Sequence, residues 1–305
     1  MDSPTFQADA LDGFTTEMVD PRYRDLDLMT TDEMVRAMNE AEAEVPRAVA
    51  AASDAIGAAV DAVAARLAAG GRLLYVGAGT PGRLGVLDAS ECPPTFSTEP
   101  WMVQGIIAGG PAALTSAIEG AEDDEDAGRR DLDELGVNAT DAVVGISASG
   151  RTPYVLGAMR AARAVGAVTV GVSSNEDSLL SAATQFPIEV VVGPEIISGS
   201  TRLKAGSAQK QVLNMLSTLS MVKLGKTYGN LMVDVSATNR KLEIRAQNLV
   251  REITGVDVET ARAALAAADQ EVKTAIVCIE RDVDALEARD LLAEADGFLR
   301  RALQV

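Results

Sequence analysis

The stretch DAVVGISASGRTPYVLGAMRAARAVGAVTVGVS, residues 141–173, decides the fold of this 305-residue chain. It holds two apolar runs, 142–146 and 167–173, separated by a hydroxyl-rich turn and a segment whose apolar residues recur at helical spacing. Consecutive strands joined by a helix run parallel, since a parallel pair needs a crossover connection. The stretch therefore predicts a parallel sheet with helices on both faces.

The same alternation continues on both sides of this stretch. Apolar runs at 72–76, 103–108 and 187–193 predict further strands, and helical patterns follow Pro81 and fill 111–122. Alanine-rich 31–71 predicts two long helices, 203–226 predicts one long amphipathic helix, and three short helical patterns lie between 248 and 305. The predicted fold class is α/β: a doubly wound parallel sheet flanked by N-terminal helices and a small C-terminal three-helix bundle.

Composition narrows the class of protein. Hydrophobic residues make up 47% of the chain, but no apolar run approaches the roughly 20 residues of a membrane-spanning helix, and the first residues do not resemble an export signal. Cys92 and Cys278 lie far apart, which suits a reducing compartment. The net charge of −18 disfavours a nucleic-acid partner. We expect a cytoplasmic protein that binds neither membrane nor nucleic acid.

The chain contains no histidine. Histidine is the usual proton shuttle near neutral pH, so proton transfer here falls to carboxylates, lysine or tyrosine. The same absence excludes Ser–His–Asp triads and histidine-dependent metal sites. We expect neither a metal nor another cofactor.

Two strand-to-helix junctions are rich in glycine and hydroxyl side chains: GAGT at 77–80 and SASGRT at 147–152. Ligands of open α/β sheets bind at such junctions, where backbone N–H groups, hydroxyls and a helix N-terminus together suit a phosphate. Tight turns without a ligand are the alternative, and that reading has equal weight for GAGT alone. SASGRT favours a phosphate, because three hydroxyls surround one glycine. Neither loop matches a nucleotide-binding motif.

At Ser147, Ser149 and Thr152 the chain matches the SxSGxT loop of the sugar isomerase (SIS) family, which holds the phosphate of a phosphosugar. Longer segments, in order, are similar to the N-acetylmuramic acid 6-phosphate etherases within that family. They are GAGTPGRLGVLDASECPPTF, AIEGAEDD, GISASGRTPYV, GSTRLKAGSAQKQVLNMLSTLSMVKLGKTYGNLMVDVSATNRKL and ITGVDVETARAALAAADQEVKTAIV. The resemblance implies cleavage of a lactyl ether to give N-acetylglucosamine 6-phosphate and D-lactate, and it implies a homodimer.

The resemblance also implies two catalytic glutamates. Its proton donor falls on Glu91 in SECPPT, and its second carboxylate falls on Glu122 in EGAEDD. Elimination needs a base and an acid, and two carboxyl groups supply both where at least one pKa is raised. Cys92-Pro93-Pro94 predicts a rigid turn that directs Glu91 toward a cleft. Among 45 acidic residues, a solvated surface charge is the alternative for either glutamate, above all for Glu122.

Contacts to the substrate and its phosphate are expected from both loops and from the start of the long helix. The expected residues are Gly79, Thr80, Gly82, Arg83, Ser147, Ser149, Gly150, Arg151, Thr152 and Lys204. For Lys204 the alternative is the wet face of an amphipathic helix, and Cys92 is expected to be an inert thiol. The chain departs from the family pattern at Pro81, where a serine is usual, and at Asp20 in TExxDP, where an asparagine is usual.

The expected domains are an N-terminal helical region at 1–50, an SIS sugar-phosphate-binding domain at 51–245 and a bundle at 246–305 that looks like a ubiquitin-associated module. Two other functions stay open. A non-catalytic regulator of the glucokinase regulatory protein type would bind a phosphosugar without turnover, although that regulator carries two SIS domains. An aldose–ketose isomerase would also use a glutamate base, but SECPPT favours the etherase.

Overall fold

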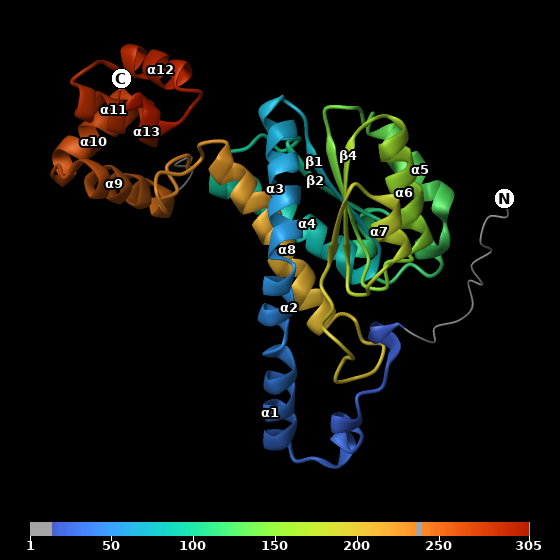
Figure 1. Ribbon diagram of the computed structural model, residues 1–305. Coiled ribbons are helices and arrows are strands. Elements are labelled where there is room, and N and C mark those ends of the chain that lie inside the picture. The colour runs from blue at the N-terminus through green and yellow to red at the C-terminus, as the bar shows by residue number, and fades with distance from the viewer. Residues whose placement is uncertain (1–13, 236–239, 305) are drawn as a thin grey trace.

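A computed structural model describes residues 14–235 and 240–304 (Figure 1). Its centre is a five-stranded, wholly parallel sheet in the order β2-β1-β3-β4-β5. The strands are β1 (Leu73–Gly77), β2 (Val103–Ile107), β3 (Ala142–Ile146), β4 (Val168–Ser173) and β5 (Phe186–Glu189). This confirms the predicted doubly wound sheet, and it brings the carboxyl ends of β1 and β3 together at the centre, where the chain order reverses.

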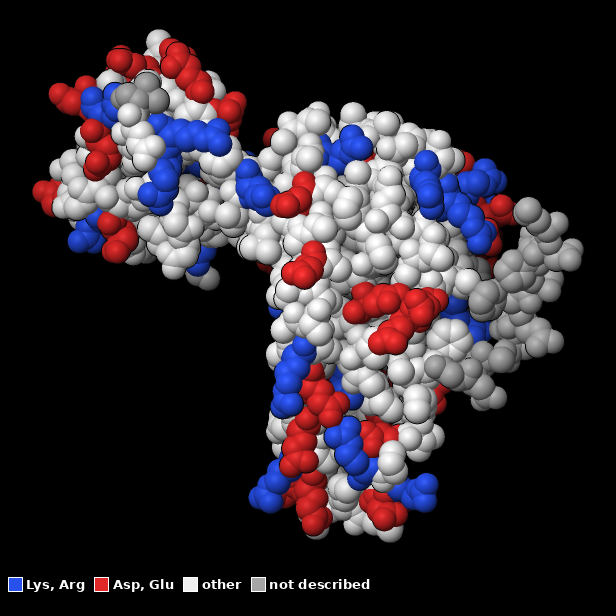
Figure 2. Space-filling view, viewed as in Figure 1, with Lys and Arg blue, Asp and Glu red and all other residues white. Residues whose placement is uncertain are grey.

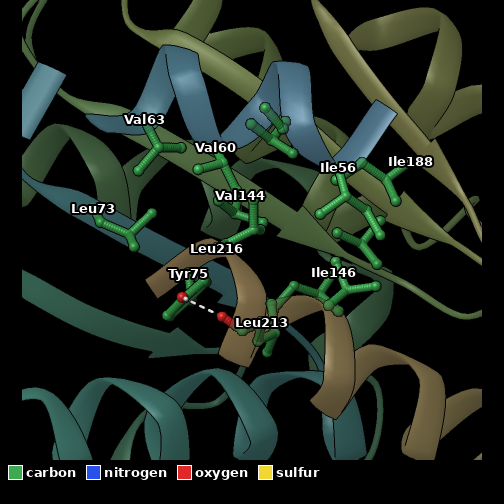
Figure 3. Close-up of a cluster of buried hydrophobic side chains, with 14 of the residues drawn as sticks. Ile56, Val60, Val63, Leu73, Tyr75, Val144, Ile146, Ile188, Leu213 and Leu216 are labelled. Carbon is green, nitrogen blue, oxygen red and sulfur yellow. Dashed lines mark hydrogen bonds between the residues drawn. The ribbon is translucent and has the colours of Figure 1, made fainter. Parts of the chain in front are cut away.

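Helices cover both faces of the sheet. On one face lie α3 (Ser53–Ala68), α4 (Gly79–Phe96) and α8 (Lys204–Lys223); on the other lie α5 (Glu125–Glu134), α6 (Pro153–Ala164) and α7 (Leu179–Ala183). Alternate residues of each strand point to opposite faces, so Leu73 and Tyr75 meet the first layer while Leu74 and Val76 meet the second. Figure 3 shows the first layer, in which Val60 of α3 approaches Val144 of β3.

The N-terminal helical region has three helices instead of the two predicted. α1 (Thr31–Glu42) stops before α2 (Val45–Ala51), and α3 follows after a further break at Ala52. Pro46 lies in the first turn of α2, where its missing N–H is tolerated but where it would interrupt a continuous helix. α1 projects beyond the body of the molecule, and charged side chains gather on it, whereas the surface over α3 is mostly uncharged (Figure 2).

The C-terminal helices form a module with a core of its own, beside the sheet domain (Figure 1). α10 (Val258–Ala267), α11 (Val272–Arg281) and α12 (Ala285–Glu294) match the three predicted patterns, and α9 (Arg240–Thr254) and the short α13 (Leu299–Ala302) add to them. The module meets the end of α8 through Phe298, whose ring covers Gly225, and through Arg300, whose guanidinium lies 4.6 Å from the centre of the Tyr228 ring. Gly225 has a φ of +73°, so a glycine serves both the turn and this close contact.

Two local predictions are wrong. The helix expected at 111–122 is instead a pair of single turns, η4 (Pro111–Leu114) and η5 (Ala121–Asp123), because Gly110 and Gly120 adopt left-handed backbone that ends a helix. The turn expected at Cys92-Pro93-Pro94 is the last turn of α4, which buried Cys92 and Phe96 hold against the core until Ser97 ends it at a φ of +48°.

Over the described residues, no single helix is long and apolar enough to cross a membrane. The bent pair Thr31–Ala51 and Ser53–Ala68 meets that test of length and composition only when its two parts are taken together.

Candidate active site

The SASGRT loop joins β3 to α6 and gathers three hydroxyls at the carboxyl edge of the sheet. Ser147 Oγ lies 2.7 Å from Thr152 Oγ1 and 3.3 Å from Ser149 Oγ, and it accepts a hydrogen bond of 3.1 Å from the N–H of Gly150. The N–H of Arg151 donates to Ser149 Oγ. The structure thus brings these predicted residues together at the N-terminus of α6, whose dipole favours an anion.

Gly150 fixes the shape of this loop. Its φ is +68°, and an added Cβ would lie 2.4 Å from Cβ of Ser178. The carbonyl of Gly150 also accepts a 2.8 Å hydrogen bond from the N–H of Leu180. The loop is therefore held on the α7 side by contacts that only glycine permits.

The GAGT loop joins β1 to α4 with a different construction. Gly77 and Gly82 pack backbone against backbone, since a Cβ on Gly77 would lie 2.6 Å from the nitrogen of Gly82. Gly79 has a φ of +59° and is exposed, while Thr80 lies beside the first turn of α8: a Cβ on Gly206 would be 3.6 Å from Cγ2 of Thr80. Pro81 occupies the first turn of α4, where proline is well tolerated.

Arg83 makes contacts that the sequence does not suggest. Its Nε donates to the carbonyl of Leu114 over 3.1 Å, and its Nη2 donates to the carbonyl of Ser116 over 3.3 Å. Both carbonyls belong to the connection between β2 and α5, which carries Glu122. Arg83 thereby ties the GAGT loop to the segment of the second predicted glutamate.

Lys204 is the first residue of α8 and is only 1% exposed. Its Nζ donates to Oε2 of Glu44 over 2.9 Å and to the carbonyl of Val192 over 2.7 Å. The ammonium predicted to contact phosphate thus already has a carboxylate partner. Beside it, Glu195 accepts from the N–H groups of Lys204 and Ala205; burial raises the pKa of the Glu195 carboxyl, and these hydrogen bonds offset part of that rise.

A segment near the N-terminus lies against the SASGRT loop. Asn175, just after β4, donates from Nδ2 to the carbonyl of Ala148 over 3.1 Å and to Thr16 Oγ1 over 3.2 Å. Its Oδ1 accepts from the N–H and the hydroxyl of Thr15, each over 2.8 Å. Sequence reasoning missed Asn175, although its position directly after an apolar strand was a usable signal.

The same N-terminal segment reaches Lys204 by a chain of charges. Asp20 pairs with Arg22 at 2.7 Å, Arg22 pairs with Glu44 at 2.8 Å, and Glu44 bonds Lys204. Hydrogen bonds from Arg22 lower the pKa of the Asp20 carboxyl. The aspartate that replaces the usual asparagine of the family pattern therefore serves as an ionic partner.

Glu122 lies in η5 and is exposed. η5 packs against α6 and lies between β2 and α5, within the connection that Arg83 holds. In a parallel sheet that connection starts at the carboxyl edge, which is also where the three hydroxyls gather.

Glu91 is exposed on α4 but is remote from the loop that begins this helix. It follows Thr80 by eleven residues, or about 16 Å along the helix axis. One turn earlier, Asp88 accepts a 2.8 Å hydrogen bond from the hydroxyl of Tyr75 in the middle of β1, so Glu91 lies alongside the amino half of the sheet. Next to it, burial raises the pKa of the Cys92 thiol to about 12, in keeping with an inert cysteine.

A doubly wound parallel sheet with a hydroxyl cradle at a helix N-terminus defines the class of SIS-type sugar-phosphate-binding domains. A family model for the glucokinase regulatory protein N-terminal SIS domain matches residues 55–163. Within the described residues, no group of three or more acidic or cysteine side chains is placed to hold a metal ion.

Whole-chain relatives narrow the class. An N-acetylmuramic acid 6-phosphate etherase of Streptomyces avermitilis is 58% identical over 96% of this chain and 94% of its own, and one of Rubrobacter xylanophilus is 57% identical over 94% and 95%. A solved phosphoheptose isomerase from Francisella tularensis has a TM-score of 0.49 at 18% identity, over 64% of this chain and 100% of that one. The chain belongs to the N-acetylmuramic acid 6-phosphate etherase family.

Proposed function

We propose that this protein cleaves the D-lactyl ether of N-acetylmuramic acid 6-phosphate to give N-acetylglucosamine 6-phosphate and D-lactate. The observation that carries the proposal is identity of 58% to a named etherase across nearly the whole chain, in a structure with a hydroxyl cradle suited to phosphate. The reaction belongs to amino-sugar catabolism, and we place it in the cytoplasm.

The chemistry needs one base and one acid. In the open-chain form of the sugar, the aldehyde at C1 acidifies the C2 hydrogen; Glu122 as carboxylate removes that proton while Glu91 as carboxylic acid protonates the lactate oxygen leaving C3. A C2–C3 double bond forms and the C3–O bond breaks. Water then adds across the double bond and restores the C3 hydroxyl. Because the chain has no histidine, carboxyl groups supply both roles.

We further propose that the phosphate binds at Ser147, Ser149 and Thr152 and at the N–H groups of Gly150 and Arg151. The GAGT side contributes Gly79, Thr80 and Gly82 as the opposite wall. Arg83 and Lys204 act next to the substrate by supplying positive potential and by holding the walls in place, because their side chains already bond protein groups.

The active form proposed here is a homodimer, with a sheet domain at 51–245 between an N-terminal helical region at 1–50 and a C-terminal bundle at 246–305. The separate core of the C-terminal module supports this division. The projecting α1, which extends beyond the body in Figure 1, gives the dimer an element with which to reach its partner.

The match to the glucokinase regulatory protein domain supports one other function, binding of a phosphosugar without turnover. Consumption of the substrate separates the two. A D-lactate dehydrogenase coupled to the reaction reports lactate from N-acetylmuramic acid 6-phosphate; steady release supports the etherase, and saturable binding without release supports the regulator. Interconversion of an aldose and a ketose phosphate without lactate would indicate an isomerase instead.

The roles of the glutamates are tested in the same assay. Glu91→Gln and Glu122→Gln each lower kcat by about 1000-fold, the scale of general acid–base catalysis, with little change in phosphosugar affinity. Glu134→Gln, an exposed glutamate of α5, is the matched control and retains wild-type kcat. Undiminished turnover in either of the first two variants refutes the role assigned to that residue.

A further inference from the structure

Glu91 and the phosphate cradle of one chain are too far apart to act on one sugar. Thr80 begins α4 at the carboxyl edge, and Glu91 lies about 16 Å further along the helix, a distance longer than a hexose phosphate. Two anchors fix this position. Asp88 bonds Tyr75 in mid-strand, and at the end of α4 the N–H of Leu73, the first residue of β1, donates to the carbonyl of Met102.

Glu122, by contrast, lies on the cradle's side of the molecule. Arg83, in the second turn of α4, bonds the segment at Leu114 and Ser116, and η5 packs against α6, the helix that starts at the cradle. A single chain therefore presents the cradle and Glu122 at one edge of the sheet, and Glu91 on the flank of α4.

Each glutamate is bordered by exposed apolar side chains. Leu87, one helical turn before Glu91 on the same side of α4, is 50% exposed. On the connection that carries Glu122, Leu114 is 37% exposed and Ile118 is 43% exposed. Charge is complementary as well, since Arg83, Arg151 and the N-termini of α4 and α6 surround the cradle while Glu91 is an anion.

We propose that a second copy of this chain completes the active site: Glu91 of the partner subunit stands opposite Glu122 and the cradle of the first. A two-fold axis makes the exchange reciprocal, so the dimer has two sites and each chain contributes to both. The apolar side chains beside each glutamate meet across this interface and exclude water from the proton transfers. The inference rests on the proposed roles of the two glutamates and adds which chain supplies each.

Heterodimers of defined composition test the proposal. Two differently tagged chains are co-expressed, and the mixed dimer is isolated by passage over both affinity resins. In a dimer of Glu91→Gln with Glu122→Gln, one site receives an intact Glu91 from one chain and an intact Glu122 from the other. This dimer is expected to show half the wild-type kcat per dimer, with the wild-type KM.

The reciprocal heterodimer is the matched control. Wild-type chain paired with the Glu91→Gln/Glu122→Gln double variant places one lesion in each shared site and is expected to be inactive. If both glutamates act within one chain, the two results exchange: the first heterodimer is inactive and the second is half active. That exchange, or a wild-type protein that sediments as an active monomer, overturns the proposal.

The proposed function fails in a different way. If either single-variant homodimer keeps wild-type turnover, the role assigned to that glutamate is wrong, whichever chain supplies it. Leu87→Asp adds a second readout, because a charge in the interface is expected to weaken the dimer in sedimentation and to make activity depend on protein concentration. Leu286→Asp, a 70% exposed leucine of α12, is expected to do neither.

Discussion

The two strand-to-helix loops at the carboxyl edge differ in what holds them. The SASGRT loop is held from within, by the Ser147 hydroxyl bonded to Thr152 and to the N–H of Gly150. The GAGT loop has no such hydroxyl network among the described contacts and is held by its neighbours, through Thr80 against α8 and Arg83 against the connection after β2. The first loop is thus shaped to bind an anion, and the second is shaped to position other segments.

The largest effect expected on this comparison comes from Gly150→Ala. The left-handed backbone and the 2.4 Å approach to Ser178 together lower the free energy of unfolding by about 4 kcal/mol, and KM for the phosphosugar rises. Gly79→Ala is the matched variant: its φ is also positive but nothing lies within 4 Å of the new Cβ, so the loss is about 1 kcal/mol. Equal losses in urea denaturation would contradict this account of the first loop.

Asp141→Asn tests the opposite edge of the sheet. Burial favours a raised pKa for the Asp141 carboxyl, but hydrogen bonds and charge from Arg72 outweigh it and hold the pKa below its usual value. The pair therefore stabilises the fold above the unfolded pKa, and this contribution is lost as pH falls through the lower folded pKa.

Replacing this buried partner costs about 3 kcal/mol at pH 7 and removes the acid-range change, as measured by denaturation between pH 7 and pH 2.5. KM is expected to stay unchanged, since Asp141 lies at the amino edge. A raised KM in Asp141→Asn would mean that the two edges are coupled.

Ser147→Ala tests the internal network. It leaves the N–H of Gly150 without its acceptor and Thr152 without its hydroxyl partner, which costs about 2 kcal/mol. We expect KM to rise about tenfold while kcat changes little, because the cradle binds phosphate and does no proton transfer. Ser90→Ala, an exposed serine on α4, is the control. A fall in kcat alone would assign Ser147 to the chemistry and not to binding.

Arg83→Lys tests the external anchoring of the second loop. Lysine keeps the charge but loses the forked geometry that reaches two carbonyls, a loss of about 1.5 kcal/mol. Because the held segment carries Glu122, we expect kcat to fall roughly tenfold with KM nearly unchanged. Arg129→Lys on the exposed side of α5 controls for the substitution. A change confined to KM would instead make Arg83 a phosphate ligand.

Pro81→Ser restores the residue usual in the family and should have the smallest effect. Proline is already compatible with the first turn of α4, so thermal denaturation is expected to show a change in stability within about 0.5 kcal/mol. KM should change less than threefold, because the phosphate is held by the other loop. A tenfold fall in KM would show that the GAGT side binds substrate directly.

Local pattern predicted much of the fold. All five strands, α4 and α8 follow from apolar period and from glycine-rich turns, and the hydroxyl cradle follows from SASGRT. The predictions failed where a short segment had several compatible conformations, as at 111–122, where Gly120 ends a pattern that reads as a helix.

The sequence by itself determined the doubly wound sheet, the hydroxyl loop and the family, because each is written in residues close together in the chain. Only the tertiary structure decided that Arg83 holds the Glu122 segment, that Asn175 binds Thr15 across 160 residues, that Lys204 faces Glu44, and that Glu91 lies three helical turns from the cradle. Such contacts depend on how distant elements pack, and no periodicity along the chain records that packing.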